Sequence, residues 1–161
     1  MSTIDNVLMQ EAIKLARQAA EQDEVPVGAV IAYQNKIIAR AYNQVEVLKD
    51  PTAHAEMIAI TQAASYLSCK WLQDCVLYVT IEPCSMCTGA LVLARIKRIC
   101  FAASDPKTGA CGSLFNLAQH NQLNHRIEIR KDILAEESGE LISSFFKTKR
   151  KKKSLPQFNQ F

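Results

Sequence analysis

The sequence predicts an α/β fold in which a mixed sheet of five strands lies between helices on both faces. Segments with strand character alternate with segments of helical periodicity, and two neighbouring strand segments near the start of the chain form a hairpin. The length of 161 residues suits one domain with a buried core. Apolar residues make up 48% and charged residues 22% of the chain, which argues against disordered, collagen-like and coiled-coil classes.

The N-terminal part predicts one helix followed by a β-hairpin. Two β-rich runs, 27–33 and 37–42, flank a polar turn at 34–36, which is typical of antiparallel strands. Residues 5–22 predict an amphipathic helix, because apolar side chains recur at helical spacing: Ile4, Leu8, Ala12, Leu15 and Ala19.

The rest of the chain predicts three more strands and three more helices. Residues 54–68 predict a helix after the break at 50–52, and Pro83 favours the opening of another helix over 84–94. Apolar residues from Asp132 onward again follow helical spacing. The remaining strands are expected at 76–80, 98–102 and 126–130. This order, αββαβαβ(β)α, favours three layers with the hairpin at one end of the sheet.

The composition indicates a cytoplasmic protein without a membrane partner. The first residues lack the basic start and apolar run of a signal peptide, and no stretch approaches the ~20 apolar residues that span a bilayer. Six cysteines in this pattern do not suggest a disulfide framework, since two are paired at C-x2-C spacing. The other four are expected to be small core or surface residues: Cys69, Cys75, Cys100 and Cys111.

Three candidate zinc ligands and one carboxylate define the candidate site. Cys84 and Cys87 are three residues apart at a predicted helix start, so both reach one metal ion, and His54 comes from a second helix start. The helix N-terminus also favours thiolates. Three protein ligands leave a fourth position for water, as in catalytic zinc sites, and Glu56 then acts on that water.

The charge of this ligand set indicates which reaction the site supports. Two thiolates and a neutral histidine balance the zinc charge, so the metal is a weaker acid and a base is needed. Glu56 can take a proton from water, deliver it to a ring nitrogen and help protonate a departing amine, which is hydrolytic deamination of a nucleobase. A structural zinc site with Cys75 or Cys100 as fourth ligand and a redox role for 84–87 are the alternatives.

These residues resemble the zinc-dependent nucleobase deaminases, whose signature combines H-x-E with P-C-x-x-C. Within that superfamily the chain is most similar to the bacterial tRNA-specific adenosine deaminases, which convert the wobble adenosine of a tRNA anticodon to inosine. The resemblance implies a three-layer α/β/α cytidine deaminase-like fold. Histidine as first ligand counts against the free-cytidine enzymes, whereas guanine deaminase stays open. The matching segments cover nearly the whole chain: 24–30, 43, 50–56, 82–87, 105–109, 124–125 and 145–146.

The resemblance implies a role for each matching residue. His54, Cys84 and Cys87 would bind one zinc ion per subunit, Glu56 would be the proton shuttle, and Asn43 would hydrogen-bond the target adenine. A turn residue that closes the second strand is the alternative for the asparagine.

A second set of residues would contact the RNA. Asp105 and its loop would meet the anticodon sugar-phosphate, and Phe145 would support the RNA on the C-terminal helix, with Val25 and Lys107 completing the substrate-binding set. Plain core packing is the alternative for Phe145, and an ordinary connector is the alternative for the loop 104–113.

A cluster of basic residues at the C-terminus fits an RNA substrate. Lysine and arginine crowd into residues 147–153, which is typical of a phosphate contact or of a solvated tail. We expect a deaminase domain over 1–146, including the C-terminal helix, and a basic extension over 147–161. The resemblance also implies a homodimer. Besides guanine or another free base or nucleotide as substrate, the alternative from another class is a non-catalytic, zinc-stabilised RNA-binding module.

Overall fold

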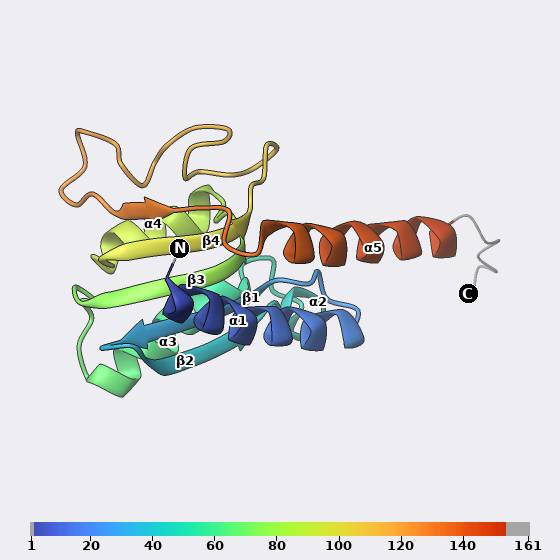
Figure 1. Ribbon diagram of the computed structural model, residues 1–161, viewed down its shortest axis with the longest axis horizontal. Coiled ribbons are helices and arrows are strands. Elements are labelled where there is room, and N and C mark those ends of the chain that lie inside the picture. The colour runs from blue at the N-terminus through green and yellow to red at the C-terminus, as the bar shows by residue number, and fades with distance from the viewer. Residues whose placement is uncertain (1, 154–161) are drawn as a thin grey trace.

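The computed structural model describes residues 2–153 and contains a central sheet of five strands with helices on both faces (Figure 1). The predicted three-layer α/β/α architecture is therefore confirmed. In chain order the elements are α1 (Thr3–Glu21), β1 (Gly28–Tyr33), β2 (Lys36–Tyr42), α2 (Val45–Leu48), α3 (Ala55–Leu67), β3 (Cys75–Ile81), α4 (Ser85–Leu93), β4 (Arg98–Ala103), β5 (Glu128–Arg130) and α5 (Ala135–Lys153).

The sheet is mixed, with the strand order β2-β1-β3-β4-β5. β1 pairs antiparallel with both β2 and β3, whereas β3, β4 and β5 run parallel to one another. The predicted hairpin lies at one end of this sheet. Gln34 and Asn35, which connect its strands, have φ values of 50° and 61°, as a two-residue turn requires when it follows the right-handed twist of the strands.

Alternate residues of each strand point to opposite faces and separate two apolar cores. Leu77 and Val79 of β3 pack with α3 and α4 on one face, while Tyr78 packs with α1 on the other. α1 approaches the sheet closely, because a Cβ on Gly28 would lie 2.0 Å from the carbonyl oxygen of Ala12. Only glycine fits at that position.

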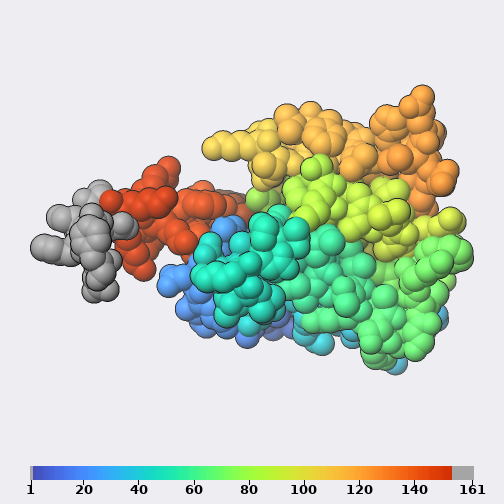
Figure 2. All heavy atoms as spheres, turned by 180° about the vertical axis from the view of Figure 1, so that it is seen from behind, coloured from blue at the N-terminus to red at the C-terminus, as the bar shows by residue number. Residues whose placement is uncertain are grey.

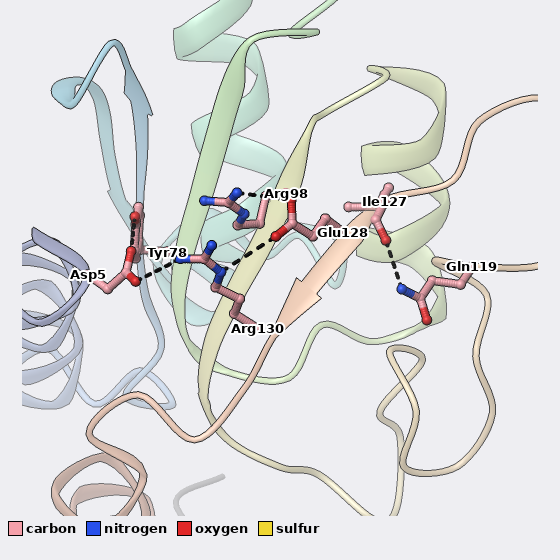
Figure 3. Close-up of polar contacts among 7 residues, drawn as sticks. All are labelled: Asp5, Tyr78, Arg98, Gln119, Ile127, Glu128 and Arg130. Carbon is pink, nitrogen blue, oxygen red and sulfur yellow. Dashed lines mark hydrogen bonds and ion pairs between the residues drawn. The ribbon is translucent and has the colours of Figure 1, made fainter. Parts of the chain in front are cut away.

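A charged network ties α1 to the middle of the sheet (Figure 3). The buried carboxylate of Asp5 accepts hydrogen bonds from the Tyr78 hydroxyl at 2.6 Å and from the Arg130 guanidinium at 3.1 Å. Arg98 donates to Glu128 at 2.9 Å, and Arg130 lies 3.5 Å from the same glutamate. This network lies on the α1 face, and its members do not line the cavity that contains the candidate zinc ligands.

The helix α5 packs by its N-terminal half and projects beyond the body by its C-terminal half (Figures 1 and 2). The buried Ser138 hydroxyl donates to the carbonyl oxygen of Thr80 at 2.5 Å, and Glu137 pairs with Arg17 of α1 at 2.7 Å. The helix is continuous from Ala135 to Lys153, so it crosses the predicted boundary between residues 146 and 147. That domain division stays a prediction, and residues 154–161 lie outside the described residues.

The structure differs from the predicted elements in three places. A short helix, α2, occupies part of the segment 44–49, for which the sequence predicts no element, and β5 is only three residues long. The helix α4 begins at Ser85, one residue after the predicted start, with Cys84 as its N-cap. Of the predicted core or surface cysteines, Cys69 is exposed, and the buried ones are Cys75, Cys100 and Cys111. Among residues 2–153, no helix has the length and apolar character needed to cross a membrane.

Candidate active site

Two helix N-termini bring the candidate zinc ligands together. His54 is the N-cap of α3 and Cys84 is the N-cap of α4, and both have an extended backbone just before the helix begins. Cys87 lies in the first turn of α4, on the same face as Cys84. The free backbone N–H groups of a helix start favour negative charge, so this position suits thiolates.

The three donor atoms have the spacing of a zinc site. The Nδ1 atom of His54 lies 3.7 Å from the Sγ atom of Cys84 and 3.5 Å from that of Cys87, and all ligand atoms lie within 4.8 Å of one another. Zinc bonds of about 2.05 Å to nitrogen and about 2.3 Å to sulfur, at a tetrahedral angle, imply an N···S separation of about 3.6 Å. The residues present therefore fit zinc.

No fourth ligand joins this cluster within residues 2–153. Cys75 and Cys100, the alternatives for a closed structural site, are instead buried in the two apolar cores on opposite faces of the sheet. Three protein ligands with room for a fourth, non-protein ligand are the arrangement of a catalytic zinc site.

The three candidate ligands shift one another's pKa values. The hydrogen bonds with the thiol of Cys87 and then with His54 lower the pKa of Cys84 to about 4, although burial opposes this shift. The hydrogen bond to Cys84 and burial raise the pKa of Cys87. The hydrogen bond with Cys84 raises the pKa of His54 against the effect of burial. A metal cation competes with these protons, because its ligands bind in their deprotonated form.

Glu56 is a buried carboxylate with a free oxygen atom. Its side chain lies in the first turn of α3, is 3% exposed, and its Oε1 atom is buried without a hydrogen-bond partner. Burial raises the pKa of Glu56 above its ordinary value, and hydrogen bonds with its own backbone amide and with the thiol of Cys87 reduce the rise. A carboxyl group with a raised pKa and an unoccupied oxygen can both accept and return a proton.

Two other buried glutamates line the same cavity, but backbone amides occupy their oxygens. Glu24 accepts hydrogen bonds from the amides of Glu46 and Val47 at 2.8 and 2.9 Å. Glu82 accepts from the loop that follows β4, including the amide of Cys111 at 3.0 Å. Of the three buried glutamates, Glu56 is the one with an oxygen available for chemistry. The sequence predicts no role for Glu24 or Glu82, although both lie in segments that match the family.

A cavity of about 380 Å³ connects these groups. Its wall contains the predicted residues Val25, Asn43 and Asp105 beside the candidate zinc ligands His54 and Cys84. The Oδ1 atom of Asn43 accepts a hydrogen bond from the amide of Ala55 at 2.8 Å, which fixes the side chain and leaves its NH₂ group as a donor. These five predicted residues thus surround one pocket, although they come from separate parts of the chain.

A wider groove of about 720 Å³ adjoins this cavity along α5. Asp105 and Phe146 line both spaces, and Lys107, Lys147 and Arg150 line the groove. Asp105 accepts hydrogen bonds from the amide of Lys107 at 3.0 Å and from two groups of Thr108, so its carboxylate shapes its own loop.

Phe145 lies next to this groove but does not line it. Its ring packs edge-on against Phe146 with a centroid distance of 5.5 Å, and the Nζ atom of Lys149 lies 5.2 Å from its ring centre. The aromatic side chain in both the cavity and the groove is that of Phe146, which is 43% exposed. Phe145 and Phe146 form one of the segments that match the family, and helical spacing alone does not show which of the two rings lines the cavity.

Known proteins are similar to this chain in sequence and in fold. Residues 4–150 match the MafB19-like deaminase family. The tRNA-specific adenosine deaminase of Bacillus subtilis (strain 168) is 46% identical over 157 residues, which is 98% of each chain. A structure from biochemical and structural studies of A-to-I editing by tRNA:A34 deaminases superposes with a TM-score of 0.80 at 40% identity, over 84% of this chain and 98% of that chain.

A guanine deaminase from Nitrosomonas europaea superposes with a TM-score of 0.74, over 87% of this chain and 83% of that chain. At 21% sequence identity this likeness concerns the fold alone. The fold and the site thus define the class of protein, a deaminase domain with the cytidine deaminase-like α/β architecture. Within that class, the chain belongs to the family of tRNA-specific adenosine deaminases.

Proposed function

We propose that the protein catalyses the hydrolytic deamination of adenosine to inosine at the wobble position of a tRNA anticodon. The observation that carries this proposal is the free Oε1 atom of the buried Glu56 beside three donors with zinc spacing, in one cavity. Relatives of high identity named as tRNA-specific adenosine deaminases support the choice of substrate. In the reaction, adenosine and water give inosine and ammonia.

His54, Cys84 and Cys87 would hold one zinc ion per subunit. Zinc in this site supplies the Lewis acidity that makes a water molecule nucleophilic at neutral pH. Glu56 accepts one proton of the attacking water on Oε1 and transfers it to a ring nitrogen of adenine. It then accepts the proton of the hydroxyl group added at C6 and transfers it to the amine, which leaves as ammonia. The NH₂ group of Asn43 donates to the target base, because its Oδ1 atom is already bonded to the backbone of α3.

The adjoining groove suits the RNA chain on either side of the target base. Lys107, Lys147 and Arg150 supply positive charge for phosphates, and Phe146 supplies an exposed ring at the junction with the cavity. Single-stranded loops are bound by such combinations of basic and aromatic side chains. An anticodon loop also lowers the cost of extracting a base, since its bases are unpaired. Val25, Asp105 and Phe145 are the remaining proposed contacts or supports of the RNA.

The proposed assembly is a homodimer, as the family resemblance implies, and the proposed location is the cytoplasm, as the composition indicates. Apolar side chains on α4 and on the loop after β4 support a subunit contact, because Leu93, Leu114 and Phe115 are all exposed. That loop packs over α4, since a Cβ on Gly89 would lie 3.9 Å from the side chain of Leu117 (Figure 2). Light scattering after size exclusion gives the mass in solution, and a monomer at all accessible concentrations would rule the dimer out.

The substrate is tested by offering the zinc-loaded protein a tRNA with adenosine at the wobble position, beside guanine and cytidine. We expect inosine from the tRNA and no product from the other two. Xanthine from guanine, without inosine in tRNA, would favour the free-base alternative. No product from any of them, with retained RNA binding, would favour the non-catalytic zinc module.

Replacing Glu56 tests the mechanism. Glu56→Gln keeps the size of the side chain but loses the group that moves the proton, so we expect kcat to fall by roughly 10²- to 10⁴-fold while one zinc ion per chain and RNA affinity are kept. Glu11→Gln, the same change at an ion-paired glutamate on α1, is the matched control and should leave kcat unaltered. Inosine formation at the wild-type rate by Glu56→Gln would refute the proposed role.

A further inference from the structure

Glu82, directly after β3, has a carboxylate that is buried and completely occupied. Its side chain belongs to a residue that is 2% exposed and is surrounded by the loop after β4. The Oε1 atom accepts hydrogen bonds from the amide of Asp105 at 3.2 Å and from the hydroxyl of Ser113. The Oε2 atom accepts from the amides of Cys111 and Ser113 at 3.0 and 3.1 Å. Four donors match the four acceptor positions of an ionised carboxylate.

This saturation distinguishes Glu82 from a catalytic acid or base. A proton acceptor needs a free lone pair directed at its substrate, and all four positions of Glu82 are used by its own chain. The neighbouring Glu56, by contrast, has a buried oxygen without a partner. The two carboxylates therefore have different tasks in one cavity.

The loop closes tightly around this carboxylate. A Cβ on Gly109 would lie 2.2 Å from the Oε2 atom of Glu82 and 2.5 Å from the carbonyl oxygen of Asp105. The absence of a side chain at position 109 lets the loop pass directly over the carboxylate. The amide of Ala110 then donates to the carbonyl oxygen of Pro83 at 2.9 Å, so the same loop also contacts the segment that leads into α4.

The bonded groups connect two functional parts of the molecule. At one end, Glu82 lies two residues before the candidate zinc ligand Cys84. At the other end, it holds the amide of Asp105, whose side chain shapes the turn to Thr108 on the wall of the cavity and the groove. A shift of the carboxylate would therefore move the loop relative to the metal site.

We infer that Glu82 is a positioning residue: its buried carboxylate fixes the loop 105–113 against the start of α4 and so sets the position of Asp105 for the RNA substrate. The role in RNA binding rests on the proposed function, whereas the role of Glu82 in fixing the loop does not. Hydrogen bonds to a charged acceptor are stronger than those to a neutral one, so four of them hold the loop in one conformation before RNA binds.

The test compares Glu82→Gln with Asp5→Asn. Glu82→Gln keeps nearly the same side-chain shape, but it replaces one acceptor oxygen with an NH₂ group. This group cannot accept hydrogen bonds from the donors that face it. Asp5→Asn removes another buried carboxylate in the network on the α1 face, away from the cavity, and controls for general loss of stability. For each protein we would measure zinc content, amide hydrogen exchange, and kcat and KM for tRNA.

In Glu82→Gln we expect full zinc content and exchange of the Cys111 and Ser113 amides that is at least about tenfold faster. We also expect KM for tRNA to rise by about tenfold while kcat changes by less than about threefold, since a displaced Asp105 weakens substrate binding without altering the proton shuttle. Asp5→Asn should leave both loop exchange and KM unchanged. If Glu82→Gln does not fold, Ser113→Ala provides a milder change, because it removes only the hydroxyl donor and keeps the backbone amide at position 113. It should raise KM in the same direction by a smaller factor.

The outcomes separate this inference from the proposed function. Unchanged loop exchange in Glu82→Gln, or faster exchange with an unchanged KM, would overturn the inference. An equal rise of KM in Asp5→Asn would also overturn it, because the effect would then be one of stability alone. If the wild-type protein does not deaminate tRNA, the proposed function fails, and the loop exchange together with the dissociation constant of an anticodon stem-loop RNA takes the place of KM.

Discussion

Replacing Tyr78 with phenylalanine removes one hydrogen bond from the network that joins α1 to the sheet (Figure 3). The Tyr78 hydroxyl donates to the Oδ1 atom of Asp5 at 2.6 Å, and both residues are buried, at 3% and 1% exposure. After the replacement Asp5 still has Arg130 on its other oxygen at 3.1 Å. The phenyl ring keeps its packing against α1, so the change is confined to the hydroxyl group.

The expected loss follows from the kind of bond. A hydrogen bond to an ionised group contributes about 1.5–3 kcal/mol, and we expect the free energy of unfolding at pH 7 to fall by about 2 kcal/mol. With an unfolding entropy of about 2.1 cal/mol/K per residue, this loss lowers Tm by about 6 °C. Tyr33→Phe is the matched control, because its hydroxyl has only a solvent-exposed bond with Gln34 at 3.4 Å, and it should change stability by less than about 0.5 kcal/mol.

The effect of Tyr78→Phe should depend on pH. Burial raises the pKa of Asp5, but the hydrogen bonds from Tyr78 and Ser2 and the hydrogen bond and charge of Arg130 outweigh it and lower that pKa below its ordinary value. A carboxylate with a lowered folded-state pKa stabilises the protein above its unfolded pKa, about 3.9, and the stabilisation is lost as pH falls through the folded value. The difference between wild type and Tyr78→Phe should therefore shrink below about pH 4.

Urea denaturation followed by circular dichroism at pH 7 and at several values below pH 5 measures this difference. A loss in Tyr78→Phe no greater than that in Tyr33→Phe would refute the assigned strength of the bond. A large loss that stays constant down to acid pH would refute the role of the Asp5 charge.

Three further predictions concern the cavity and the groove. Cys87→Ser should lose zinc by elemental analysis and lower Tm, because metal binding stabilises the folded state; retained stoichiometric zinc would contradict this. Phe146→Ala should raise KM for tRNA by about tenfold, or about 1–3 kcal/mol of lost stacking, and Phe145→Ala should raise it less; the reverse order would contradict the lining seen here. Replacing Lys147 and Arg150 with alanine should reduce the slope of log affinity against log salt by about 1.4, measured by RNA binding, if each contacts one phosphate.

The elements that are predicted correctly are those with a local cause. The long helices follow from an apolar period of 3.6, and the hairpin and the inner strands follow from short, β-rich apolar runs. A single segment displays either pattern by itself. The clustering of His54, Cys84 and Cys87 follows from two helix starts and a spacing of three residues. Both patterns depend on neighbours in sequence, so they are visible without the fold.

The elements that the sequence does not predict depend on distant partners. The short helix α2 begins where the amides of Glu46 and Val47 donate to Glu24, a residue more than twenty positions earlier in the chain. The strand β5 is predicted over 126–130, but its length depends on its pairing with β4, which covers only three residues. Phe145 and Phe146 are adjacent, about 100° apart around α5, and only the packed structure decides which one faces the cavity.

The three buried glutamates show why residue type does not assign a chemical role. Each lies in a segment that matches the family, and each lines the same cavity. Backbone amides bind both oxygens of Glu24 and of Glu82, so these carboxylates hold two segments that form parts of the wall. Glu56 keeps one oxygen free, and burial raises its pKa. The sequence predicts Glu56 as the acid–base residue from the H-x-E pattern, and the fold adds a physical reason. The position of every amide donor depends on the folded backbone, and this backbone leaves an oxygen without a partner on Glu56 but on neither Glu24 nor Glu82.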